Sequence, residues 1–275
     1  MKIYATLHLL SRVFLGVFLF GFSAIAAPQT GHDENRYRDC MNLAARSPDK
    51  AINNALVWKN EGGGVPARHC EAVGLFHMGE YEEAAARMEL IASDMRTGKG
   101  MPVSEGKRLV ASSSMMADMY GQAAKAWLEA GEIIRAEGAI DQALGLAAQE
   151  SPQALDLLVD RARIAAADED YHLALTDLET VKRLDAGRKD ILVLIASAAR
   201  GIGDFNKALS ALDIFQEVYP ENTAGHLERA NLMDVQGFSA LARQSWLKVL
   251  AVTEFGPDAD AARANLERTD VNKDR

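Results

Sequence analysis

A short motif recurs along this chain: a glycine, an aromatic or aliphatic residue two positions later, and an alanine three positions after that. It is most complete at Gly203, Phe205 and Ala208. Three copies of its alanine, Ala174, Ala208 and Ala242, follow one another at intervals of 34 residues. A fixed period of this length indicates stacked helical hairpins, because one hairpin cannot bury its apolar face alone. The sequence therefore predicts an all-α repeat protein, an α-solenoid of antiparallel helix pairs.

The motif varies from copy to copy. Its other occurrences are Gly79–Tyr81–Ala84, Gly138–Ile140–Ala143, Glu169–Tyr171–Ala174 and Gly237–Ser239–Ala242. The glycine is expected between the two helices of a hairpin, because the first helix ends there in a left-handed conformation. The alanines, together with Ala162, Ala196 and Ala230 in the first helices, are expected where the two helices cross closely. These recurring residues are therefore expected to pack the helices together, and the residues that contact a ligand should lie between them in the sequence.

The first 27 residues differ in composition from the rest of the chain. They contain no acidic residue, carry Lys2 and Arg12, and run apolar over Val13–Phe22 before Ala24-Ile25-Ala26, which has a small residue on either side of Ile25. This is the pattern of a cleavable export signal. The alternative is a membrane anchor, but the apolar run of about ten residues is short for a span. No cysteine lies directly after the cut, which argues against a lipoprotein. We expect a periplasmic or secreted protein.

Two cysteines, Cys40 and Cys70, lie after the expected cleavage point. An even number of cysteines in an exported protein indicates a disulfide. Closing a loop of about 30 residues stabilises a fold by roughly 3–4 kcal/mol. A redox or metal-binding pair, with His69 beside Cys70, is the alternative, but the chain has no Cys-x-x-Cys motif. We therefore expect a structural bond that ties an N-terminal helix to the third helix.

The charge balance limits the classes of partner. The whole chain has a formal net charge of −9, and removal of Lys2 and Arg12 with the leader makes it −11. An acidic protein is poorly suited to nucleic acid or anionic lipid. No second stretch is apolar enough to cross a membrane, so no membrane insertion is expected after signal cleavage. The oligomeric state is left open.

Signals of catalysis are weak in this sequence. The histidines after the leader, at positions 32, 69, 77, 172 and 226, have no metal-ligand spacing. There is no Gly-x-Ser-x-Gly nucleophile turn, and Gly62–Gly64 lacks the lysine of a phosphate-binding loop. We therefore predict a protein that is not an enzyme, with no catalytic residue, no cofactor and no metal site.

The expected organisation has five parts. They are a cleavable leader at 1–27, N-terminal helices with the disulfide and a first hairpin at 28–95, an irregular insert at 96–120, tandem repeats at 121–254, and a capping helix with a tail at 255–275. The insert is expected because glycines and a proline interrupt the period after residue 95. The final helix is expected at Asp258–Arg268, where an acidic first turn matches the helix dipole.

Inside these parts we expect particular helices. The insert should contain a helix at Lys107–Met119, and the first repeats after it should contain helices at Gln122–Ala136 and Ile140–Gln149. Regular helix pairs should then cover 153–186, 187–220 and 221–254. Five methionines, Met95, Met101, Met115, Met116 and Met119, gather around the insert. They suit the packing of an irregular interface, and a copper site of thioether ligands is the alternative that we favour less.

The residues of the best-preserved repeat resemble the tetratricopeptide repeat (TPR) family. In the order large, small, glycine, aromatic, alanine and proline, the matching residues are Leu192, Ala196, Gly203, Phe205, Ala208 and Pro220. Trp127 and Gly131 match the family's tryptophan and glycine in an earlier unit. The resemblance covers about 66–254 and is strongest over 120–250. It implies a right-handed superhelix whose inner groove, lined by the first helix of each hairpin, takes up a peptide or protein segment.

Residues of the first helices that face away from the core would line this groove. Read in register, they are Glu129, Glu132, Arg135, Asp156, Asp160, Arg163, Asp190, Ser197, Arg200, Glu228, Asn231 and Asp234. Acids and arginines alternate among them, so a mixed-charge, extended ligand would suit the face. For any one residue, an ordinary solvated position is the alternative.

Three hypotheses about function follow. The first is an exported scaffold or adaptor that holds a protein or peptide partner in its groove. The second is a solute-binding component of a transport system, which requires an enclosed apolar pocket instead of an open groove. The third is an enzyme with an unrecognised site. The first agrees best with the resemblance, although a fold by itself is a weak guide to function.

Overall fold

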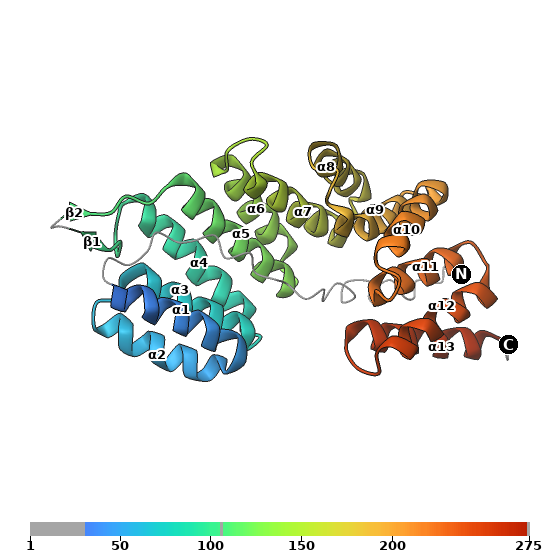
Figure 1. Ribbon diagram of the computed structural model, residues 1–275, viewed down its shortest axis with the longest axis horizontal. Helices are drawn as coiled ribbons and strands as arrows, with labels where there is room; N and C mark the ends of the chain where they lie inside the picture. Colours follow the sequence, from blue (N-terminus) through green and yellow to red (C-terminus); the bar gives the residue numbers. More distant parts are fainter. Residues whose placement is uncertain (1–30, 105–106, 274–275) are drawn as a thin grey trace, which may run out of the picture. The chain divides into compact units, whose positions relative to one another are not determined.

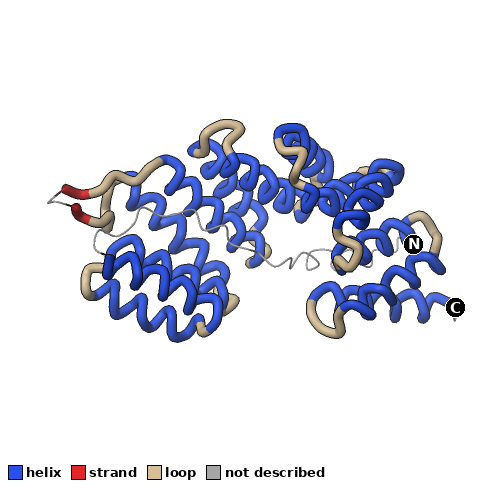
Figure 2. Tube along the Cα trace, in the orientation of Figure 1, coloured by secondary structure: helices blue, strands red, loops and turns tan. Residues whose placement is uncertain are grey.

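The computed structural model describes residues 31–104 and 107–273, and the expected leader at 1–27 lies outside them. The described residues are helical apart from their connections and one two-stranded hairpin (Figures 1 and 2). They divide into two compact units, residues 31–164 and 165–273, with the boundary inside one helix. The fold is an all-α helical-repeat solenoid, as the period of the motif predicts.

The N-terminal unit contains six helices and most of a seventh among the described residues. They are α1 (Gly31–Arg46), α2 (Pro48–Asn60), α3 (Gly64–His77), α4 (Tyr81–Arg96), α5 (Ser113–Glu129), α6 (Ile133–Leu146) and α7 (Pro152–Ala167), with strands β1 (Val103–Ser104) and β2 (Lys107–Arg108) between α4 and α5. Helix α1 packs against both α2 and α3, and each helix from α3 to α6 packs against the one before it. Their shared core includes Met88, Trp127 and Ile140.

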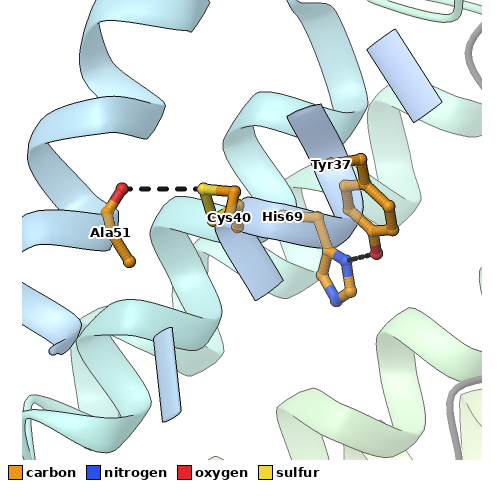
Figure 3. The surroundings of a disulfide bond; sticks show 5 residues. Tyr37, Cys40, Ala51 and His69 are labelled. Carbon is orange, nitrogen blue, oxygen red and sulfur yellow. Dashed lines mark hydrogen bonds between the residues drawn. A yellow bond between two sulfur atoms is a disulfide. The ribbon is translucent and has the colours of Figure 1, made fainter. Parts of the chain in front are cut away.

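The expected disulfide is present in this unit. Cys40 of α1 and Cys70 of α3 are bonded, with their Cα atoms 6.1 Å apart, and both residues are buried. Figure 3 shows the surroundings of the bond, with Cys40 beside the backbone of Ala51 and near the side chains of Tyr37 and His69. The bond fixes the first helix of the described chain to the third, so it stabilises the N-terminal end of the helix stack.

The expected insert is shorter than the sequence suggested. The helix expected at Lys107–Met119 begins only at Ser113; before it, strands β1 and β2 form a hairpin in which Val103 pairs with Arg108 and Ser104 with Lys107. Helix α5 begins at Ser113, because Ser112 caps it by accepting a hydrogen bond from the N–H of Met115. It then runs without interruption to Glu129. The prediction of a helix at Gln122–Ala136 is therefore wrong at both ends, because α5 begins before Gln122 and ends before Ala136.

The turn that follows α5 lies at a different glycine from the one predicted. Gly131, with φ 79°, ends α5 in the left-handed conformation, and Ala136 follows in α6. Gly138, which the sequence placed in this turn, lies inside α6, and a Cβ there would meet nothing within 4 Å. The interval from Gly131 to Glu169, which holds the equivalent turn of the next hairpin, is four residues longer than the 34-residue period. Because of this longer interval, the helices predicted here were placed wrongly.

The C-terminal unit contains the regular repeats. Its elements are α8 (Tyr171–Leu184), a short 3-10 turn (Lys189–Ile191), α9 (Leu192–Gly201), α10 (Phe205–Val218), α11 (Thr223–Val235), α12 (Ser239–Val252) and α13 (Pro257–Lys273). Each helix packs against the next, and α11 also contacts α9 and α13. The predicted packing alanines, Ala196, Ala208, Ala230 and Ala242, are all fully buried. The period thus correctly located the close crossings of this unit.

One turn of this unit keeps the repeat geometry without glycine. Glu169 takes the left-handed conformation, with φ 64°, that Gly203 and Gly237 take in the next two turns. Asp170 then caps α8 by accepting a hydrogen bond from the N–H of Leu173. A residue with a Cβ pays about 1–2 kcal/mol for this conformation, so the hairpin is formed against a local strain.

The last helix closes the C-terminal unit. Leu227, Trp246 and Leu266 belong to one buried cluster, so α13 covers the apolar face of α11 and α12. The helix begins at Pro257 and continues past Arg268, where the sequence ended it, to Lys273. No helix of the described residues has both the length and the apolarity needed to cross a membrane.

The methionines around the insert form part of the core. Met95, Met101, Met115 and Met119 are buried together with Val65 and Ile91, and Met116 packs at the edge of this cluster. Their flexible side chains fill the irregular interface between α3, α4, α5 and the hairpin. This arrangement supports the packing interpretation of these residues.

Candidate partner-binding face of the first helices

The first helices of the C-terminal unit are joined by one ion pair. Arg200 of α9 lies against Glu228 of α11, with its Nε 2.6 Å from Oε1 and its Nη2 3.2 Å from Oε2. The exposed fractions of the two side chains are 16% and 6%. Burial alone would lower the pKa of Arg200, but the charge and hydrogen bonds of Glu228 raise it above its ordinary value. The pair links α9 to α11 directly.

Polar residues surround this pair on the same two helices. Ser197 Oγ lies 3.4 Å from Arg200 Nη2 and is half-buried, as is Asn231, one turn beyond Glu228 on α11. Asp234, a further three residues along, accepts a hydrogen bond from Arg268 of α13 at 2.6 Å. The predicted groove residues of this unit thus share one face, and most of the charged ones are already paired across helices.

The first helices of the N-terminal unit are joined in the same way. Asp160 of α7 is buried and accepts from Lys125 of α5 and from Arg163, each at 2.9 Å. Gln153 of α7 donates to Asp118 of α5 at 2.6 Å. Because these bonds run between α5 and α7, they fix the spacing of the two first helices. Asp160 and Arg163 therefore lie where the sequence placed them, but as members of a network.

Three predicted groove residues lie elsewhere. Glu132 is the residue before α6 and Arg135 belongs to α6, which is a second helix. The guanidinium of Arg135 lies 4.5 Å from the ring centre of Trp127, a cation–π contact. Both residues were misplaced because the turn lies at Gly131 and not at Gly138. Asp190, expected on α9, lies in the 3-10 turn before it and pairs with Arg188.

Sequence reasoning found only part of the polar face of α5: Glu129 was expected, but Asp118, Gln122 and Lys125 were not. The four residues recur at intervals of four, three and four, which places them on one side of a helix. Burial raises the pKa of Glu129 above its ordinary value. The spacing was visible in the sequence, but the helix boundary drawn between Met119 and Gln122 divided the row.

A buried hydrogen-bond chain links three helices near the disulfide. His69 of α3 bonds through Nδ1 to the hydroxyl of Tyr37 at 2.6 Å and through Nε2 to the side-chain oxygen of Gln122 at 2.8 Å (Figure 3 shows the first of these bonds). A neutral imidazole satisfies both, accepting from the tyrosine and donating to the glutamine. Burial lowers the pKa of His69 to about 4, although the Gln122 bond opposes this. His69 therefore has a packing role.

The described residues contain no group of three or more histidine, cysteine, aspartate or glutamate side chains that could hold a metal ion. A groove of about 940 Å³ lies on α1 and α2 and is open to solvent. Polar residues such as Asn35 and Asp39 line it together with apolar ones such as Leu43, Val57 and Trp58. Because it is open, this groove differs from the enclosed pocket that solute transport would require.

Comparisons with known proteins identify the fold. No family model matches the sequence, and no curated protein matches it. Among solved structures, the TPR-like repeats of a Podosopora anserina kinesin light chain are similar, with 18% identity over 68% of this chain and 93% of that one and a TM-score of 0.54. MamA, from residue 41 onward, of Desulfovibrio magneticus RS-1 has 17% identity over 72% of this chain and 94% of that one, with a TM-score of 0.50.

A third similar structure is a chain of the APC/C hetero-tetramer Cut9–Hcn1. Its identity is 15%, its TM-score is 0.57, and the match covers 85% of this chain but 46% of that one. The chain therefore has the tetratricopeptide repeat fold, which confirms the resemblance that the motif residues carried. At these identities the similarity concerns the fold alone.

Proposed function

We propose that this chain is an exported, non-catalytic scaffold that holds a protein or peptide segment against the face of its first helices. The TPR fold supports this proposal, since stacked hairpins present one extended face that is built from the same helix of every repeat. One of the similar folds, in the Cut9–Hcn1 structure, occurs in an assembly of several chains. No enzymatic step is needed for such a role.

The observation that carries the proposal is the arrangement around Arg200 and Glu228. Their buried ion pair holds α9 and α11 in register, while Ser197 and Asn231 remain half-exposed on either side. Hydroxyl and amide groups can both donate to and accept from the backbone of an extended chain. A fixed frame with adaptable polar groups beside it is suited to holding a peptide segment, because the frame loses little entropy on binding.

The proposed location rests on the disulfide and the leader together. Disulfides persist in oxidising compartments and are rare in the cytosol, and Cys40 and Cys70 form one. The test is N-terminal sequencing of the protein recovered from the periplasm. A mature chain that begins near Pro28 supports export; a full-length chain in the cytosol would contradict it.

The binding face can be tested with two matched double variants. Ser197→Arg with Asn231→Arg should obstruct the face of α9 and α11 and reduce partner recovery in a crosslinking pull-down by at least about tenfold. Asn206→Arg with Ser210→Arg changes the same residue types on the exposed side of α10 and should leave recovery unchanged. Equal recovery with both variants, at wild-type helical content, would overturn the assignment of this face.

The same purified protein separates the scaffold from the solute-binding hypothesis. A ligand that binds the folded state raises the melting temperature. The scaffold proposal expects a shift with partner peptides. A shift with small solutes, without any response to peptides, would favour the transport component instead.

A further inference from the structure

The hairpin between α4 and α5 forms an arm at the edge of the helix stack. We use the term arm for residues 97–104 and 107–112, since residues 105–106 lie outside the described part. Figures 1 and 2 show strands β1 and β2 extending beyond the ends of the neighbouring helices. An arm of this kind interrupts the 34-residue period.

The base of the arm is fixed by close backbone contacts. The N–H of Val65 donates to the carbonyl oxygen of Gly100 at 2.7 Å. Gly64 and Gly100 both have left-handed backbone conformations, with φ 55° and 73°, and a Cβ on Gly64 would overlap the Gly100 carbonyl oxygen. Asp94 bridges Arg68 and Lys99, at 2.5 and 3.2 Å. The arm is therefore held in one place, at a cost in backbone freedom.

The two faces of the arm differ in character. Met101 and Leu109 pack into the methionine cluster, so one face is anchored to the core. Val103 and Val110, in contrast, are 56% and 88% exposed. Arg108 lies directly opposite Val103 in the hairpin register, so these two side chains are on the same side of the hairpin. The exposed part of the arm therefore combines a guanidinium with two aliphatic side chains.

The charge of the arm is opposite to that of the whole chain. Lys107 and Arg108 are both exposed at β2, and Arg96 and Lys99 lie at the base, whereas the chain has a formal net charge of −9. We propose that Val103, Lys107, Arg108 and Val110 form a docking surface for an acidic, extended protein segment in which carboxylates alternate with aliphatic side chains. This surface is separate from the face of the first helices.

The match between this surface and such a segment is chemical. An extended segment laid beside β2 would place alternate side chains toward the arm, so its aliphatic groups would meet the two valines. A carboxylate between them would reach Arg108, whose Nη1 donates to the carbonyl oxygen of Gly98 and leaves the other guanidinium donors for the ligand. An anionic bilayer fits less well, because the acidic remainder of the chain would be repelled from it.

The test uses a labelled heptapeptide, Glu-Val-Glu-Val-Glu-Val-Glu, and fluorescence anisotropy with the full oxidised chain. We expect saturable binding that weakens as salt is added. Lys107→Glu with Arg108→Glu should weaken it by at least about tenfold, since two favourable charges become repulsive. The matched control, Lys182→Glu with Arg183→Glu, reverses two adjacent exposed basic residues at the end of α8 and should bind as the wild type does.

A second arm variant keeps the test valid if the first variant fails to fold. Val103→Thr with Val110→Thr changes two exposed side chains, so it should keep the fold and still weaken the peptide by several-fold. Equal affinity of the wild type and both arm variants would overturn the proposal. Binding to vesicles of anionic phospholipid without binding to the peptide would overturn it in favour of a membrane contact. The groove variants Ser197→Arg and Asn231→Arg should leave peptide affinity at the arm unchanged.

Discussion

Arg200 of α9 and Glu228 of α11 form a two-pronged ion pair that is nearly withdrawn from solvent. The guanidinium nitrogens Nε and Nη2 lie 2.6 and 3.2 Å from the two carboxylate oxygens. The two residues are 28 positions apart in the sequence, on the first helices of consecutive hairpins. Their bond therefore links one repeat directly to the next.

Removing one partner of this pair should cost much stability. Glu228→Ala leaves a buried guanidinium without its counter-charge, and we expect the free energy of unfolding to fall by about 3–5 kcal/mol. Urea denaturation followed by circular dichroism measures the change. Lys182→Ala, which removes an exposed and longer ion pair with Glu179, should cost less than about 1 kcal/mol. Equal losses for the two variants would show that Arg200 and Glu228 do not fix the interface.

The position of the turn after α5 can be tested with two glycines. Gly131→Ala places a Cβ in a left-handed turn and should lower the free energy of unfolding by about 1–2 kcal/mol. Gly138→Ala lies in the middle of α6 with open space around it, so it should raise stability by about 0.5–1 kcal/mol. Thermal unfolding of both variants shows whether each substitution raises or lowers stability. A gain for Gly131→Ala and a loss for Gly138→Ala would mean that the turn lies at Gly138, as the motif predicted.

These two glycines show what could and could not be predicted from the sequence. Three hairpins with alanines 174, 208 and 242 at equal spacing were located correctly, because a regular period overrides local ambiguity. Gly131–Ile133–Ala136 and Gly138–Ile140–Ala143 both fit the motif, and the longer interval before Glu169 removed the register that would have chosen between them. Where the period is broken, the local pattern cannot show which of two glycines lies in the turn.

The candidate face was predictable to a similar extent. The residues Asp160, Arg163, Ser197, Arg200, Glu228, Asn231 and Asp234 lie on first helices, as the register required. What the sequence could not show is that Arg200 pairs with Glu228 and that Asp160 pairs with Lys125, because such bonds depend on the spacing between repeats. An irregular insert was expected at 96–120, but its β1–β2 hairpin was not, since strands of two residues carry no periodic signal.

The buried His69 should make stability depend on pH. Its pKa in the folded protein is about 4, below the ordinary value of 6.5, so between these values the unfolded chain binds a proton that the folded chain does not. Stability from this group is complete above pH 6.5 and falls by about 3 kcal/mol as the pH drops toward 4. His69→Gln should reduce this slope, measured by urea denaturation across the range. A parallel slope in both proteins would contradict the assignment.

The Cys40–Cys70 bond should be closed and stabilising. Thiol titration of the unfolded protein without reductant is expected to find no reactive cysteine, because both form the bond. Cys40→Ser with Cys70→Ser should lower the free energy of unfolding by about 2–4 kcal/mol, chiefly by freeing the unfolded chain. Two titratable thiols in the purified protein would contradict this account. A stability loss with unchanged helical content would confirm it.

The central claim is that a partner lies on the face formed by the first helices. A photo-reactive benzoylphenylalanine placed at Asn231 of α11 should form a crosslinked adduct with a protein partner in intact cells, because this position is half-exposed beside Arg200 and Glu228. The same residue at Asn206, on the exposed side of α10, should form none. An adduct at Asn231 alone is the predicted result. Adducts at Asn206 and none at Asn231 would contradict the claim.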